Sequence, residues 1–408
     1  MADHLFHLYI PLIPSHYRVR SSPQDAVRDI TYLETLSGRN KIAFNMERFE
    51  YQQVALSGVA SMIYIYSLDK IDLIHIMPIL QNLGLHVIDQ LTTKVGNRNQ
   101  NLGYIQSFRV LDCDGNAIDE DTYRDLIGCI IIEVFNDRTE NDTLNQLALR
   151  CGLDWRAINV IQLYRNVYLQ LDAPFSKGQV HQALLMNPQS TKYLFDYFEA
   201  KFSCKEVFGD LNHRKKNLQN IDRDFIDSLQ SVEDIASDII LRRVFNLMTC
   251  TLRTNFYIPN SPAQTAISIK LDSEKVQQMP SPSPFREIYV HDVHMEGTHL
   301  RFGSVSRGGV RWSDRISDFR SEVLGLVKTQ QAKNVVIVPE GSKGGFVVKK
   351  QAHSKEEAQD IAKEQYRRFI QSLLDITDNV DTEGQVHHPS HVLCYDTADP
   401  YLVVAADK

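Results

Sequence analysis

The chain has 408 residues, of which 43% are hydrophobic and 23% are charged, and its formal net charge at pH 7 is -7. This length predicts about two to four domains, and the composition is that of a folded globular protein, which excludes disorder as the default. A net negative charge gives no general attraction to phosphate backbones or anionic lipid, so nucleic-acid binding is disfavoured.

The sequence carries no feature of secretion or membrane insertion. Six cysteines are spread along the chain with no CxxC pair, which fits a reducing compartment. The first 14 residues contain a short apolar patch but no basic region and no long apolar core, unlike a signal peptide. No run reaches the roughly 18 apolar residues of a membrane-spanning helix. We therefore expect a cytoplasmic protein without a membrane partner.

Residues 1–135 alternate strand-like and helix-like patterns. Residues 61–66, 85–89 and 104–111 are predicted strands, and Leu73 to Leu83 is a predicted amphipathic helix that Gly84 closes. The resulting β-α-β-β arrangement resembles a small ACT-like ligand-sensing module. A plain α/β spacer domain is the alternative, because such modules carry no diagnostic motif.

Residues 136–258 have a helical period and are predicted to form a helical middle domain. Aromatic residues at helical spacing between Tyr193 and Phe202 are expected in its core rather than on a stacking surface. The basic run at 213–216 is expected to be a solvated helix face or turn. Proline, serine and asparagine at 257–262 mark the end of this domain.

Residues 259–408 are predicted to form an α/β domain that holds the chemistry. Residues 266–271 and 287–290 are predicted strands separated by a proline-rich connector. The segment 306–315 then gathers Arg307, Gly308, Gly309 and Arg311. Paired glycines can approach a ligand closely or adopt φ angles closed to other residues, and arginines grip carboxylates bidentately. The segment suits a small dicarboxylate; an ordinary glycine turn with surface arginines is the alternative.

A helix, a strand and a lysine-bearing segment follow. Residues 318–333 are a predicted helix that ends at Lys333, and 334–338 are a predicted buried strand. Lys343 then stands in a predicted glycine-rich loop between strands. A phosphate-binding P-loop needs serine or threonine after its lysine, whereas Gly344 follows Lys343, so phosphate binding is disfavoured. Residues 391–395 and 401–406 are two further strand-like runs, and Asp407 follows the second.

In this order, the runs RGGVRWSDR (307–315), EVLGLVKTQQAKN (322–334) and VPEGSKGGFVVK (338–349) resemble the large NAD-specific glutamate dehydrogenases. The motifs cover 288–408, and the preceding part resembles that family's long N-terminal extension in layout. The resemblance implies a multidomain α/β fold: ACT-like module, helical domain and substrate-binding domain. It also implies NAD-dependent oxidative deamination of L-glutamate to 2-oxoglutarate and ammonia by a homo-oligomer.

The resemblance also assigns roles to single residues. Lys343 matches the catalytic lysine, Asp407 the catalytic aspartate, and Lys333 a lysine that binds substrate carboxylate. Arg307 stands where smaller relatives have a lysine before the glycine pair, a change that keeps the charge but not the geometry. Arg311 matches an arginine of the same motif, with a supporting or carboxylate-orienting role.

The chemistry follows from charge. Lys343, crowded by other cations, is expected to have a lowered pKa and to activate water, while Asp407 exchanges a proton with the substrate nitrogen. Hydride transfer needs a dinucleotide site, yet no strand followed by GxGxxG occurs in the 408 residues. We therefore expect a truncated product of a longer gene, with the NAD site in a domain after Lys408 and no NADH binding by this chain.

Three other readings stay open at this point. The chain could be a non-catalytic regulatory or assembly piece, or part of a dehydrogenase for a branched-chain amino acid or phenylalanine. A metal hydrolase is disfavoured because Pro389 breaks the helix that its histidines would need, and no metal site is predicted. Its ligands would come from His387, His388 and His391 with Asp396 or Asp399. Two other histidines, His291 and His294, are expected on opposite faces of one strand, satisfying local hydrogen bonds.

Overall fold

The computed structural model describes residues 8–38, 41–53, 56–97, 101–204, 211–259, 265–334 and 340–406. The chain divides into two compact units, Met1–Ile158 and Asn159–Lys408, and each is described by itself. Across the ranges that are described, no helix is both long enough and apolar enough to traverse a bilayer.

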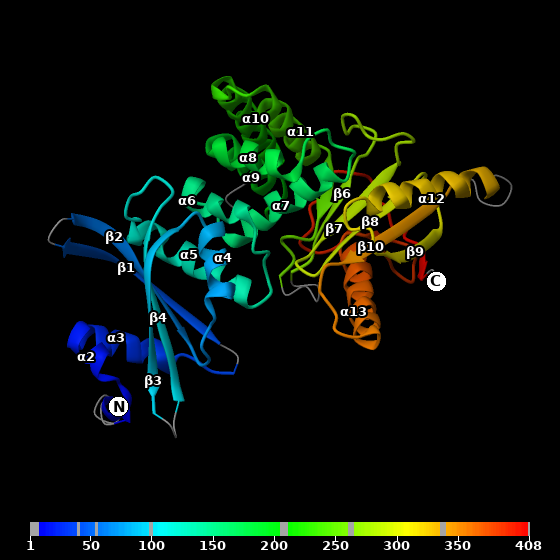
Figure 1. The fold of residues 1–408 in the computed structure, drawn as a ribbon. Coiled ribbons are helices and arrows are strands. Elements are labelled where there is room, and N and C mark those ends of the chain that lie inside the picture. Colours follow the sequence, from blue (N-terminus) through cyan, green and yellow to red (C-terminus); the bar gives the residue numbers. More distant parts are fainter. Residues whose placement is uncertain are drawn as a thin grey trace. The chain divides into compact units, whose positions relative to one another are not determined.

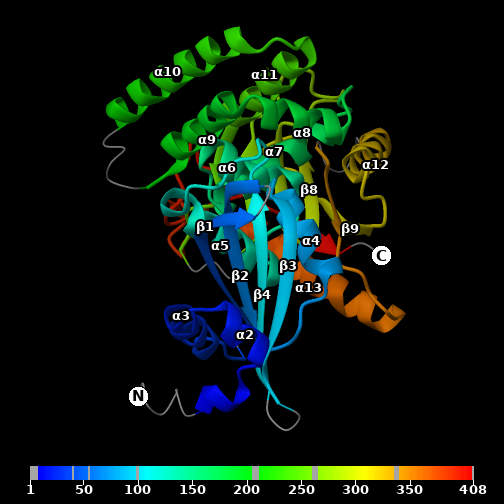
Figure 2. The ribbon, with the colours of Figure 1, turned by 60° about the vertical axis from the view of Figure 1, so that its left-hand side comes forward.

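The first unit is built on a four-stranded antiparallel sheet in the order β1-β2-β4-β3, which Figure 2 shows side by side. The strands are β1 (Ile42–Gln53), β2 (Leu56–Ser67), β3 (His86–Gly96) and β4 (Asn101–Leu111). The helical segments are η1 (Ile10–Leu12), α2 (Ser15–Arg20), α3 (Pro23–Glu34), α4 (Leu73–Asn82), α5 (Glu120–Phe135), η2 (Thr143–Gln146) and α6 (Leu147–Cys151).

Helices pack on both faces of this sheet. Leu33 of α3 shares a core with Tyr66 of β2, and on the other face Phe44 of β1 lies against Gly128 of α5. The predicted strands and helix correspond to β2, α4, β3 and β4, and Gly84 has the positive φ of a helix-ending glycine. Strand β1 and helices α3 and α5 were not predicted. In β1 the residues from Ile42 to Met46 are all buried, so the strand lacks an alternating pattern.

The second unit begins with a helical layer (green in Figure 1). Its helices are α7 (Trp155–Leu169), which begins in the last residues of the first unit, α8 (Lys177–Met186), α9 (Pro188–Phe202), α10 (Leu211–Ser228), η4 (Leu229–Ser231) and α11 (Ile235–Thr249). The ring of Phe198 is fully buried among other aromatic rings, including those of Tyr164 and Phe202, as expected for a core cluster. The solvated face predicted for 213–216 is wrong for Arg214. This residue is buried and donates to the carbonyls of Ala200 and Ser203.

A seven-stranded sheet in the order β13-β9-β10-β8-β7-β6-β5 forms the rest of the unit. Neighbouring strands are antiparallel except for the parallel pairs β9 with β10 and β13 with β9. The strands are β5 (Thr251–Thr254), β6 (Ile267–Leu271), β7 (Arg286–His291), β8 (Met295–Arg301), β9 (Gly308–Ser313), β10 (Ser342–Val348) and β13 (Val404–Ala406). A separate hairpin joins β11 (Asn379–Val380) and β12 (Val386–His387).

Two helices pack on opposite faces of this sheet (Figure 1). On one face, Val323 of α12 (Phe319–Asn334) contacts Leu300 of β8. On the other face, Phe369 of α13 (Lys355–Leu374) packs with Met295 and Phe346. Leu300 and Met295 stand five positions apart in one strand, where odd spacing places side chains on opposite faces.

Three expectations for this unit are wrong or untested. Residues 391–395 are not a strand, and His391 has a positive φ. His294 lies in the turn between β7 and β8 rather than on the strand that ends at His291. Asn334 is the last residue of α12 and starts no strand, and 335–338 lie outside the described residues. Short apolar runs look alike in strands and in extended segments, so the sequence did not separate them.

Candidate active site

Lys343 is the second residue of β10, so the loop predicted around it is wrong. The glycines that suggested a loop serve close packing instead. A Cβ atom on Gly344 would lie 2.7 Å from Cγ2 of Val310, and one on Gly345 would lie 2.4 Å from Cγ2 of Val323. The glycines therefore let β9 and α12 approach β10, and Lys343 is held by a strand rather than by a turn.

Lys343 and Arg311 lie on the same face of the sheet, the face that α12 covers. Gly345 pairs with Arg311 in the parallel register of β10 and β9, and Lys343 stands two residues before Gly345. Side chains two apart in a strand share a face. Leu300, the antiparallel partner of Lys343, packs against α12 on this same face.

The surroundings of Lys343 favour its neutral form. The residue is only 6% exposed. Burial, and then the positive charge of Arg311, lower the pKa of the Lys343 ammonium. An amine with a lowered pKa is neutral more often near neutral pH, and only the neutral amine can take a proton from water.

Arg311 is held between β9 and α12 by a carboxylate. Its Nη1 lies 3.4 Å from Oε1 of Glu322, in the first turn of α12, and Oε2 of Glu322 accepts a hydrogen bond of 2.6 Å from the Ser313 hydroxyl. The buried Nε of Arg311 has no hydrogen-bond partner within the described part of the chain. Arg311 therefore keeps a buried donor beside Lys343.

Gly308 and Gly309 belong to β9 and have no positive φ, so the predicted unusual backbone angles are wrong. Close approach is the reason for Gly308. A Cβ atom there would lie 1.6 Å from the backbone oxygen of Ser342, the residue before Lys343. The close approach predicted for the glycine pair thus involves the chain's own backbone.

The other three predicted site residues are placed less completely. Arg307 is exposed and forms a β-bridge with Gly341, two residues before Lys343. Lys333 lies in the last turn of α12, but its side chain is outside the described residues, and so is Asp407. Strand β13, which directly precedes Asp407, pairs with 308–310 of β9. The structure thus brings Lys343, Arg311 and the backbone of Arg307 together. The catalytic and substrate-binding roles of all the predicted site residues stay predictions.

Sequence reasoning missed a buried ion cluster on the opposite face of the sheet. Arg301 Nη1 lies 3.0 Å and Lys270 Nζ 2.6 Å from Oδ2 of Asp399, and Lys270 also contacts Asp396. Arg253 bonds Asp396 and Asp378. A signal was present at Lys270, because a single cation inside the otherwise uncharged strand β6 is unusual unless an anion faces it.

The metal-hydrolase reading named residues that are otherwise engaged. His387 bonds Asp381, and His388 bonds Asp378. The side chains of Asp378, His388 and Cys394 lie close enough to hold a metal ion. However, both carboxylate oxygens of Asp378 already accept hydrogen bonds, from Arg253, His388 and the backbone N–H of Asp399. This carboxylate has no oxygen free of a donor, so we assign it to the ion cluster.

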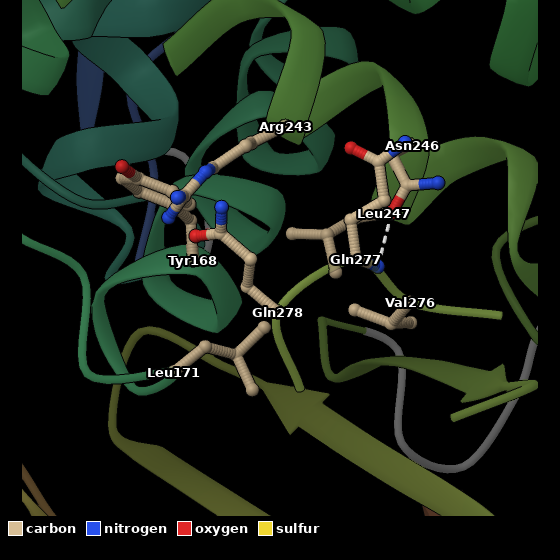
Figure 3. Close-up of a pocket in the computed structure, with 8 residues that line it drawn as sticks. All are labelled: Tyr168, Leu171, Arg243, Asn246, Leu247, Val276, Gln277 and Gln278. Carbon is tan, nitrogen blue, oxygen red and sulfur yellow. Dashed lines mark hydrogen bonds between the residues drawn. The ribbon is translucent and has the colours of Figure 1, made fainter. Parts of the chain in front are cut away.

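A small cavity lies apart from these residues, between the end of α7, α11 and 276–278 (Figure 3). The Arg243 guanidinium and the Gln278 amide stand next to Tyr168 there, and the N–H of Gln277 donates to Asn246. The volume open to a water-sized sphere is about 10 Å³. That is room for about one water molecule, too little for an amino acid.

Comparison with protein families yields three matches in chain order. Residues 49–123 match the ACT3 domain of glutamate dehydrogenase, 139–204 its helical motif 3, and 224–408 the catalytic domain of bacterial NAD-glutamate dehydrogenase. This order confirms the predicted fold class of an ACT-like module, a helical region and a catalytic α/β domain.

Several proteins similar to this chain are also described as NAD-specific glutamate dehydrogenases. NAD-specific glutamate dehydrogenases of Pseudomonas aeruginosa, Halomonas elongata and Mycobacterium tuberculosis are 37%, 34% and 32% identical over 97%, 97% and 98% of this chain. The matched parts are 24%, 24% and 25% of those proteins, so the chain spans about a quarter of the length of the curated relatives it matches.

Proposed function

The chain belongs to the NAD-specific glutamate dehydrogenase family, and we propose that it supplies the glutamate-binding part of an enzyme that oxidatively deaminates L-glutamate. Glutamate, NAD⁺ and water would give 2-oxoglutarate, ammonium, NADH and a proton. The observation that carries the proposal is the pairing of Lys343 with Arg311. Both cations lie on the sheet face that α12 covers, and their positive charges would attract the carboxylates of an anionic substrate.

The cationic residues of the candidate site would bind the carboxylates of the substrate. Arg311, whose Nε has no partner among the described residues, and the exposed Arg307 would bind carboxylates of glutamate. Lys333 would bind another carboxylate oxygen. Glu322 would keep the Arg311 guanidinium in place. These contacts would orient the Cα–H bond of the substrate and hold it for reaction.

Lys343 and Asp407 would move the protons. Bound NAD⁺ supplies the acceptor for the hydride that leaves Cα, which converts the substrate amine into an iminium. Neutral Lys343 would take a proton from water as its oxygen bonds to that carbon. Asp407 would have accepted a proton from the substrate ammonium before the hydride left, and it would return this proton to the nitrogen after water has added. The C–N bond would then break as ammonia leaves, and the hydroxyl would give its proton to solvent as the ketone forms.

We propose that NAD binds outside these 408 residues. The sequence contains no glycine fingerprint of a dinucleotide site. Relatives described as NAD-specific are about four times as long as the part that matches this chain. The homo-oligomer and the cytoplasmic location expected from the sequence stay predictions.

Calorimetry on the chain tests the substrate site. We expect 2-oxoglutarate or glutamate to bind, and Arg311→Met to weaken binding about 10- to 100-fold, the loss typical of one charge-assisted contact. Arg315→Met is the matched control, because Arg315 lies in the same segment but is exposed and pairs with Asp318. Equal affinities for the two variants, or no binding by the unchanged chain, would refute this substrate site.

A further inference from the structure

Arg301 links two parts of the second unit that are far apart in sequence. It is the last residue of β8, and its backbone pairs with Ser342, the residue directly before Lys343. Its side chain points to the opposite face of the sheet from Lys343, because the residue paired with Lys343 is Leu300. There the guanidinium meets the segment that leads to β13.

The contacts of Arg301 with that segment are close and buried. Nη1 lies 3.1 and 3.0 Å from the two carboxylate oxygens of Asp399, and Nη2 lies 3.1 Å from Oδ1. Nη1 also donates to the backbone oxygen of Tyr401 at 2.7 Å. The Arg301 side chain is 6% exposed and that of Asp399 is 16% exposed. A bidentate pair with an extra backbone bond fixes direction as well as distance.

Lys270 and Asp378 complete the attachment of Asp399. Lys270 Nζ lies 2.6 Å from its Oδ2, and the backbone N–H of Asp399 donates to Asp378. Burial alone would raise the pKa of Asp399, but Lys270 and Arg301 outweigh it and hold that pKa below its ordinary value. Asp399 is therefore charged and held from both sides near neutral pH.

The chain runs from this attachment directly to the sheet. After Tyr401, Leu402 and Val404 pack in the core beside Phe369, and Val404 to Ala406 form β13 next to β9. Asp407 is the next residue of the sequence. Arg301 thus stands in register with Ser342, next to Lys343, and its side chain bonds the segment that leads to Asp407.

From these contacts we propose that Arg301 and Asp399 are positioning residues of the reaction, which fix the segment ahead of Asp407 relative to Lys343. The proposal rests on the proposed function, because it takes Lys343 and Asp407 as the proton-transferring pair. Neither Arg301 nor Asp399 needs to touch substrate. A displacement of about 1 Å between reacting groups can lower a rate about 100-fold, so the attachment acts on turnover.

A neighbouring ion pair provides the control. Arg286, the strand partner of Arg301 in β7, bonds Asp272 at 2.9 Å, and both side chains are largely buried. No described contact of this pair reaches 396–406. Arg286→Met should therefore lower stability much as Arg301→Met does, while leaving 396–406 attached.

The experiment compares these variants in the complete gene product. We expect Arg301→Met and Asp399→Asn to lower kcat about 10- to 100-fold while KM for glutamate stays within about threefold. Arg301→Lys, which keeps the charge but not the fork, should recover part of the rate. Arg286→Met should keep kcat within about threefold despite a similar loss of thermal stability. An unchanged kcat in folded Arg301→Met, or an equal fall in Arg286→Met, would overturn the proposal.

Hydrogen exchange separates this proposal from the proposed function. Amide exchange over 402–406 should be faster in Arg301→Met than in Arg286→Met at matched stability. If the unchanged protein does not oxidise glutamate, the proposed function fails, whatever the exchange shows. If it oxidises glutamate but exchange over 402–406 is the same in both variants, the positioning role alone is wrong.

Discussion

Lys343 and Arg311 lie on one face of the sheet, on neighbouring parallel strands, and the charge of Arg311 helps to lower the pKa of the Lys343 ammonium. Burial is the larger cause. The same two residues can therefore serve two purposes, because the cation that would bind a substrate carboxylate also helps to keep the lysine neutral.

Replacing Arg311 should change the pH dependence of turnover. Without the neighbouring cation, the protonated form of Lys343 is less disfavoured, so its pKa should rise towards the ordinary value. If neutral Lys343 is the base, the acid limb of the pH profile of kcat should move to higher pH in Arg311→Met. Arg315→Met should leave that limb in place. Coincident profiles for Arg311→Met and the unchanged enzyme would contradict the assignment.

Gly308→Ala should prevent the strands from closing. The added Cβ would lie 1.6 Å from the Ser342 oxygen, a distance that only backbone movement can relieve. We expect a loss of several kcal/mol in the free energy of unfolding, or no folded protein. Gly325→Ala in α12 is the control, because its added Cβ would have no described atom within 4 Å apart from its chain neighbours and its own helix backbone. That change should stabilise the helix by about 0.5–1 kcal/mol. Chemical denaturation measures the free energy of unfolding of both variants. Equal changes in that free energy would show that strand β9 does not lie so close to Ser342.

The ion pair of Arg320 and Glu287 should show strong coupling. Nε and Nη2 of Arg320 each lie 2.8 Å from a carboxylate oxygen of Glu287, and both side chains are fully buried. Removing one partner leaves an uncompensated charge, so Arg320→Met and Glu287→Gln should each cost about 3–5 kcal/mol. The double variant should cost much less than their sum. Additive losses in a double-mutant cycle would mean that the pair is not formed.

Lys201 should make the second unit more stable at alkaline pH. Burial lowers the pKa of its ammonium from the ordinary 10.5 to about 8, so the folded protein binds fewer protons than the unfolded chain between these values. Stability contributed by this group must then rise with pH across that window, by about 3 kcal/mol in all. Urea denaturation at about pH 7.5 and pH 10 should show this rise in the unchanged protein relative to Lys201→Met. Parallel pH dependences would contradict the lowered pKa.

Local patterns predicted the elements whose signal lies within one segment. The helix ending at Gly84 and strands β6 and β7 follow from residue types and period alone. The signals around Lys343 were misread because its glycines are required by partners distant in sequence. Gly345 makes room for Val323 of α12. The sequence alone does not distinguish such a packing glycine from a glycine in a loop.

The sequence predicted the cationic residues of the candidate site. It did not predict the residues that surround and bind those cations. The pattern RGGVR pointed to Arg307 and Arg311, but nothing near them in sequence names Glu322 as the partner of Arg311. Arg301 and Asp399 stand 98 residues apart, so only the fold reveals the pair. Pairings of this kind depend on strand order, which the residues of one strand do not encode.

Turnover of L-glutamate by a Lys343→Met variant of the complete gene product tests the central claim most directly. NADH formation should be followed at saturating glutamate and NAD⁺, with melting temperature and glutamate binding checked in parallel. We predict that kcat falls by a factor of about 10³ or more, because the base that activates water is lost, while fold and binding persist. A folded Lys343→Met enzyme with kcat within about tenfold of the unchanged enzyme would show that Lys343 is not the catalytic lysine.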